Sequence, residues 1–98
     1  MLVEKKAENT KVVAIKLVTG EEVIARKLSD DDRFIMVSRP LAMVMAENPD
    51  NPTQTRVMFT PWMVAAGKEV MSINNNHVIA VVPAREDAAE QYEQAIAS

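Results

Sequence analysis

Apolar and more polar positions alternate along the first part of the chain. Val13, Ile15 and Leu17 recur at every second residue, which is the pattern of a half-buried β-strand. Residues 19–22 then predict a tight turn, because Gly20 can supply the positive φ that such a turn needs. The fold is therefore expected to begin with a strand that enters a hairpin.

Two further strands follow that turn. The second is expected over residues 22–28, and the third begins at residues 34–37 after a solvated acidic turn at residues 29–33. Arg39-Pro40 interrupts the third strand, and because proline cannot donate to a strand ladder we expect a bulge, a bend or an edge there. The strand resumes over residues 41–45, so the pattern predicts a small, bent sheet.

Turn signals divide the rest of the chain into short segments. Residues 47–52 combine two prolines with three Asn or Asp residues and predict a loop. Strands are expected over residues 55–60, 69–73 and 77–82, and the last of these has the composition of a buried strand. The Asn triplet at 74–76 predicts the turn between the last two strands, since Asn tolerates left-handed backbone conformations.

The C-terminal segment changes from strand to helix periodicity. Pro83 suits the first turn of a helix, and Glu86 and Asp87 follow where the helix dipole favours anions. An amphipathic helix is expected over residues 84–97, packed on the sheet or on a partner. Its apolar face comprises Ala88, Ala89, Tyr92, Ala95 and Ile96.

Length and composition indicate one mainly β domain. The 98 residues divide into a flexible N-terminal segment (1–10), a barrel (11–83) and a C-terminal helix (84–98). The absence of Cys excludes disulfides, thiolate zinc sites and Cys nucleophiles. No run approaches the ~20 apolar residues of a membrane span, and the N-terminus lacks the apolar core of a secretory signal, so we expect a cytoplasmic protein.

The spacing of residues in the first three strands resembles the first motif of the Sm-like (Lsm, Hfq-type) family. Ala25 stands where the family's second Gly allows a sharp strand bend, and Leu28 lies one position later than the family's Leu. The Asp of the following turn corresponds to Asp31, or to Asp32 if the alignment follows Leu28. The matching positions before that turn are Val13, Ile15, Leu17, Gly20 and Val23.

Residues 73–79 are similar to the family's second motif, with Asn74 replacing its basic residue and Asn75 its Gly. The resemblance implies a strongly bent, five-stranded Sm-like (SH3-like) barrel, here followed by a C-terminal α-helix. The long insertion at residues 55–67 and the C-terminal position of the helix resemble the divergent Sm-like proteins of bacterial viruses.

The resemblance also implies a binding site for single-stranded RNA, formed by the turns of the two motifs. The family's base-stacking position falls on Arg33 or Phe34, depending on which Asp is aligned, and its base-reading Asn is replaced by Ile35 or Met36. The acidic net charge of −3 is unusual for a monomeric, non-specific nucleic-acid binder, although a ring can gather positive charge on one face. The candidate RNA-binding residues are Arg33, Phe34, Asn74, Asn75, Asn76 and His77.

Sm-like proteins form rings by pairing the fourth strand of one subunit with the fifth strand of the next, which correspond here to residues 69–73 and 77–82. Residues 78–82 carry no charge, and as an exposed edge they would be an aggregation hazard. We therefore expect a homo-oligomeric ring. The candidate interface residues are Val70, Met71, Ile73, Val78, Ile79 and Val81.

Two alternatives to an RNA-binding ring are an assembly module that retains the ring without RNA recognition and, more weakly, a monomeric SH3-like adaptor. An enzyme is not expected, because His77 is the only His and no nucleophile or paired-carboxylate motif is present. We expect no cofactor, metal, membrane or small-molecule substrate, since the acidic triplet at 30–32 is typical of a solvated hairpin tip.

Two further groups of residues allow either a structural or a binding role. Trp62 is interpreted as a lid over the barrel end, with a stacking platform or an interface anchor as the alternative. The methionines are interpreted as core filler, with an adaptable interface as the alternative. They are Met43, Met45, Met58 and Met63.

Overall fold

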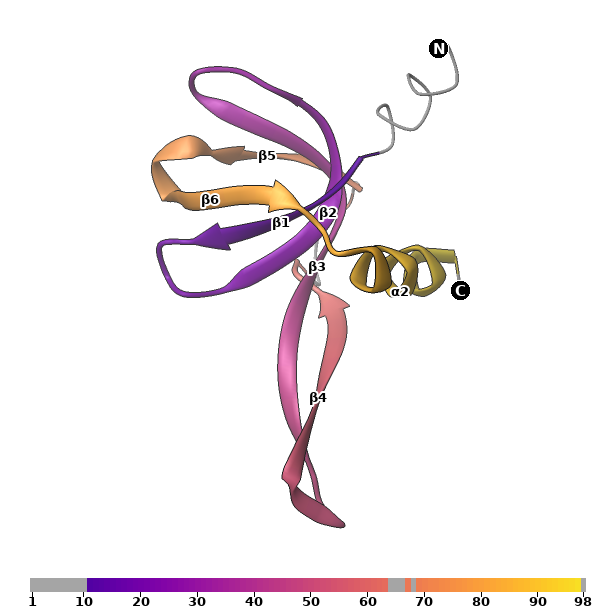
Figure 1. The fold of residues 1–98 in the computed structure, drawn as a ribbon. Coiled ribbons are helices and arrows are strands. Elements are labelled where there is room, and N and C mark those ends of the chain that lie inside the picture. The colour runs from indigo at the N-terminus through magenta and orange to yellow at the C-terminus, as the bar shows by residue number, and fades with distance from the viewer. Residues whose placement is uncertain (1–10, 64–66, 68, 98) are drawn as a thin grey trace.

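An antiparallel β-sheet and one helix make up the part of the chain that the structure, a computed structural model, describes: residues 11–63, 67 and 69–97 (Figure 1). The N-terminal segment expected over residues 1–10 lies outside these residues. The elements are β1 (Val12–Leu17), β2 (Glu22–Asp30), β3 (Phe34–Asn48), β4 (Asn51–Pro61), β5 (Val70–Asn74), the 3₁₀ turn η1 (Asn75–His77), β6 (Val78–Pro83) and α2 (Glu86–Ala97).

The sheet has six strands in the order β4-β3-β2-β1-β6, and β5 pairs with the first half of β3. The long strand β3 therefore pairs with β5 before Arg39 and with β4 after Pro40. Among the described residues no pairing joins β5 to β6, so the sheet is curved but not closed. The expectation of a five-stranded barrel is corrected in the number of strands and in the closure of the sheet. The additional strand is β4, whose second half comes from the 55–67 insertion.

The core lies inside the curved sheet and confirms the predicted alternation of β1. Val13, Ile15 and Leu17 are buried, and residues from three other strands complete the cluster: Val23, Ala25, Ile35, Val37 and Ile73. Trp62 is partly buried and packs against this cluster, as expected for a lid.

A β-bulge at Arg39-Pro40 explains the bend of β3. Ile24 pairs with Leu41 and Arg26 with Ser38, so two residues of β3 oppose the single residue Ala25 of β2. Arg39 has a φ of 51°, which is rare for a residue with a side chain, and bulges bend and twist the strand that contains them. The predicted interruption of β3 is therefore a bulge, and it lies opposite the small residue that the sequence placed at a strand bend.

Beyond this bulge, β3 and β4 form a two-stranded hairpin, here called the arm (residues 41–61), which projects away from the rest of the sheet (Figure 1). Two methionines of the arm and one that follows it are largely exposed: Met45 by 70%, Met58 by 49% and Met63 by 51%. The interpretation of Met45, Met58 and Met63 as core filler is wrong for the single chain, because each side chain is exposed to this extent. Met43 is partly buried.

Helix α2 is anchored beside the same bulge. The buried Tyr92 donates its hydroxyl to the carbonyls of Ser38 (3.0 Å) and Arg39 (2.8 Å). The Arg39 guanidinium in turn donates to the carbonyl of Ile96 at the end of the helix, at 3.1 Å. Arg26 and Glu93 add an ion pair between β2 and α2.

The helix begins at Glu86, two residues later than expected. Pro83 lies in β6 and pairs with Val13, so it ends the sheet and does not open the helix. In the part of the chain that the structure covers, no helix has the length and apolar character needed to cross a membrane.

Candidate functional site

The two turns singled out in the sequence lie side by side. The Asn75 side-chain amide donates to the carbonyl of Asp31 at 2.8 Å, and the Asn75 backbone N–H donates to the carbonyl of Arg33, also at 2.8 Å. These two bonds connect the β5–β6 turn to the β2–β3 turn across 44 residues of sequence. The sequence indicated a turn at the Asn triplet, but nothing local in it indicated that Asn75 makes this link.

Asp31 holds the β2–β3 turn in shape. Its carboxylate Oδ1 accepts the backbone N–H groups of Arg33 and Phe34, each at 2.8 Å. The bond from Phe34, followed by the bond from Arg33, lowers the pKa of Asp31 below its ordinary 3.8, because both bonds favour the charged form. The Asp31 carboxylate thus stabilises the turn, which agrees with the interpretation of the acidic triplet as a hairpin tip. Within residues 11–63, 67 and 69–97, no group of three or more His, Cys, Asp or Glu side chains is placed to hold a metal ion.

Arg33 and Phe34 project from this turn at the surface. Phe34 is 39% exposed and lies opposite Asn74 in the β3–β5 pair. Both can present a planar group to a nucleobase, one as an aromatic ring and the other as a guanidinium. Ile35, in contrast, is 2% exposed and belongs to the core, so it does not reach a base bound at the turn.

The remaining candidate residues divide between two hollows. His77 and Asn74 line a hollow of ≈ 380 Å³ together with Trp62 and Val18, and the carbonyl of His77 accepts the N–H of Val18 at 2.9 Å. Asn75 lines a different hollow of ≈ 320 Å³ beside Asp31. The structure therefore brings Arg33, Phe34 and Asn75 to one turn pair and places His77 next to Trp62.

Asn74 and Asn76 form a hydrogen bond that stabilises the turn between β5 and β6. The Asn74 side chain accepts the N–H of Asn76 at 2.9 Å and caps η1. Asn74, which stands where the family has a basic residue, therefore stabilises the turn and brings no positive charge to it.

An open seam separates β5 and β6 next to the turn pair. Val81 pairs with the core residue Ile15 and shares its face, yet Val81 is 39% exposed. Ile79 forms a bulge in β6 and is 63% exposed. The sequence-based expectation of a buried last strand is therefore wrong for the single chain, because no strand of the same chain covers that edge among the described residues.

The six candidate interface residues fall into two groups. Val70, Ile79 and Val81 are exposed at the seam. Ile73 is 5% exposed and lies in the core, and Met71 and Val78 pack partly against it. The side chain of Ile73 is thus part of the core of the single chain.

Comparison with known proteins agrees with this architecture. No curated protein matches the chain. A protein-family model, the Sm_like domain, matches residues 14–93, which run from the third residue of β1 through β6 and most of α2. With the order of strands and the paired turns, this match shows that the chain belongs to the Sm-like family.

Proposed function

We propose that the protein is a non-catalytic Sm-like ring that binds single-stranded RNA at the paired turns. The observation that supports the ring is the open seam: among the described residues β5 and β6 each pair with a strand on one side only, and apolar residues are exposed along β6. Unpaired edges of this kind recruit another strand, and a head-to-tail contact closes into a ring when its rotation permits.

The pairing that satisfies this seam joins β5 of one copy to β6 of the next. An antiparallel arrangement is expected, since every other pair in the sheet is antiparallel and such pairs are slightly more stable per residue. It would cover Ile79 and Val81, which together expose apolar surface that the chain alone leaves in water.

RNA binding is proposed at Arg33 and Phe34 because these two side chains are exposed and offer a cation and a stacking surface side by side. A ring repeats this pair once per subunit, and several weak contacts along one strand combine through their high effective concentration. The overall charge of −3 per chain does not prevent this, because the local field at the turn acts on the nucleic acid.

Fluorescence anisotropy with uridine-rich, adenine-rich and mixed single strands at two salt concentrations tests the RNA proposal. We expect Phe34→Ala and Arg33→Ala to weaken binding, and Arg33→Ala to reduce the salt slope by about 0.7 for each phosphate contact it removes. Lys11→Ala is the matched control, since it removes one positive charge from an exposed position just before β1, outside both turns and the arm. Binding that is unchanged by both turn variants would contradict the proposed site.

A second candidate is an assembly module that keeps the ring without recognising RNA. The observation that favours it is the position of Asp30, Asp31 and Asp32 beside Arg33, because these carboxylates repel phosphate. Absence of binding to all three strands at low salt, from a protein that is still oligomeric, would establish this alternative.

A further inference from the structure

The arm exposes apolar side chains on both of its faces. Beyond Ala42 the strand β3 pairs only with β4 among the described residues, and a two-stranded hairpin on its own is marginally stable in water. Four of its apolar side chains are nevertheless exposed: Val44 by 45%, Met45 by 70%, Val57 by 46% and Met58 by 49%. The arm therefore has the surface of an element that packs against something.

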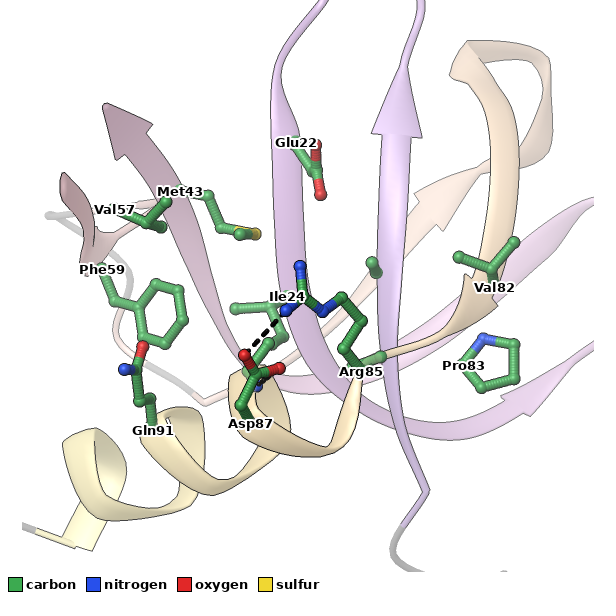
Figure 2. Close-up of a pocket in the computed structure, with 13 residues that line it drawn as sticks. Glu22, Ile24, Met43, Val57, Phe59, Val82, Pro83, Arg85, Asp87 and Gln91 are labelled. Atoms are coloured by element: carbon green, nitrogen blue, oxygen red, sulfur yellow. Dashed lines mark hydrogen bonds and ion pairs between the residues drawn. The ribbon is translucent and has the colours of Figure 1, made fainter. Parts of the chain in front are cut away.

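One face of the arm already borders a groove. Met43, Val57 and Phe59 form one wall of a hollow of ≈ 340 Å³, which Figure 2 shows with α2 below and Val82 opposite. Ile24 lies at its floor, and Ala88 and Gln91 of α2 contribute to its lining. The lining of the groove is mainly apolar, and the Arg85–Asp87 ion pair lies at its side (Figure 2).

The opposite face of the arm presents a second pair of exposed apolar side chains. Directly opposed residues of an antiparallel pair lie on the same face, so Met45 shares the face of Val57, towards the arm's own groove. Val44 and Met58 oppose each other and point to the other side. The Val44–Met58 face, which does not line the arm's own groove, is therefore available to contact a partner.

The strand pairing proposed above brings a second copy to this groove. When β5 of a neighbour pairs antiparallel with β6, the Val70 end of that β5 lies at the Val82 end of this β6. In each chain Val70 pairs with Ser38, the residue just before the bulge from which the arm departs. The base of the neighbour's arm then lies beside Val82, which lines the groove.

The strand contact alone is too small for a stable subunit interface, so a further contact surface is expected. β5 has five residues, which span only about 17 Å at ~3.4 Å per residue. A stable protein–protein interface buries about 1,200–2,000 Å², far more than such a short strip of backbone contact provides. A contact made by the arm would supply apolar area next to the strand pair.

We propose that the Val44–Met58 face of one copy's arm docks in the groove of the next copy, between that copy's arm, α2 and the end of β6. This inference rests on the proposed ring and adds a second contact to each subunit interface. Each arm then uses its Met43–Phe59 face to build its own groove and its Val44–Met58 face to fill the neighbouring one.

Cysteine cross-linking tests this arrangement on the full chain, which contains no Cys. One chain carries Met58→Cys and a second, differently tagged chain carries Ala88→Cys, so that a cross-link between the two tags must join separate molecules. Met45→Cys replaces Met58→Cys in the matched control, because it lies on the same hairpin but on the opposite face. Ser72→Cys with Ala80→Cys, both at exposed positions on the two edge strands, tests the ring separately.

With a short bismaleimide, we expect both the Met58/Ala88 and the Ser72/Ala80 mixtures to give a mixed-tag band at twice the chain mass of 10.9 kDa, and the Met45/Ala88 mixture to give much less. A Ser72/Ala80 band without a Met58/Ala88 band above the control would overturn the arm contact and leave the ring intact. Absence of both bands would overturn the arm contact and the ring together.

Discussion

The hydroxyl of Tyr92 is a single group whose removal tests how α2 holds the bend of β3. Tyr92→Phe keeps the buried ring and deletes only the oxygen that donates to the carbonyls of Ser38 and Arg39. These carbonyls flank the start of the bulge, at the point where β3 leaves β5 and enters the arm. The substitution therefore separates the polar anchor from the apolar packing of the helix.

The expected loss of stability follows from one shared proton and two carbonyls. A net hydrogen bond contributes about 1 ± 0.5 kcal/mol, and a buried acceptor left without a partner adds a desolvation cost of about 1–3 kcal/mol. Because one hydroxyl proton serves both carbonyls, we expect about 1–2 kcal/mol in total. For a domain of this size, each kcal/mol lowers Tm by roughly 4–8 °C.

Glu93→Gln is the comparison variant in the same helix. Its ion pair with Arg26 is only partly shielded, with side-chain exposures of 32% for Arg26 and 41% for Glu93, and pairs of this kind contribute about 0.2–1 kcal/mol. Thermal and urea unfolding should be measured at one protein concentration, since oligomers unfold in a concentration-dependent way. A smaller effect for Tyr92→Phe than for Glu93→Gln would refute the proposed anchoring.

Tyr92 also provides a pH test with a defined sign. Burial raises the pKa of Tyr92 above its ordinary 10.0, so the folded state favours the neutral phenol. Its contribution to stability is complete below pH 10.0 and is lost as the pH rises through the higher folded value. The stability difference between wild type and Tyr92→Phe should therefore shrink at alkaline pH, and a difference that grows would contradict this assignment.

Three further predictions concern the turns and the seam. Gly20→Ala should lower the free energy of unfolding by about 1–2 kcal/mol, because Gly20 has a φ of 95° while nothing lies within 4 Å of an added Cβ. Gly67→Ala is the control, since Gly67 has equal space and no positive φ, and it should be nearly neutral in the same unfolding assay. Equal losses of stability in the two variants would contradict the argument. Asp31 has a lowered pKa, so its contribution to stability is present above pH 3.8 and is lost as the pH falls through the pKa of the folded state. Asp31→Asn should remove that part of the dependence of stability on acid pH. Identical profiles of stability against pH for the two proteins would refute the role of the carboxylate. Val81→Glu should leave the far-UV circular dichroism of the chain unchanged and reduce its oligomeric mass, because the side chain is 39% exposed in the single chain; retention of the wild-type mass would count against the seam as the interface.

The strands of the sheet could be predicted because their signals are local. The alternation of Val13, Ile15 and Leu17 and the positive φ of Gly20 depend on neighbouring residues only. The bend of β3 was also marked locally by Pro40, which cannot take part in a regular ladder. The bulge itself, however, depends on how Arg39 and Pro40 oppose Ala25 of another strand.

The candidate site depended on contacts that sequence patterns do not carry. Asn75 links the two turns through bonds to residues more than 40 positions away, and any of three consecutive Asn residues could have filled that position. The exposure of Met45 and Met58 was missed because an apolar side chain predicts burial without indicating which molecule provides it. The apolar strand β6 was expected to be buried for the same reason.

The mass of the full chain in solution tests the central claim most directly, since the open seam between β5 and β6 carries both the ring and the arm contact. Size-exclusion chromatography with multi-angle light scattering at micromolar concentration should give one species with a mass several times 10.9 kDa. A single species of 10.9 kDa under the same conditions would contradict the account.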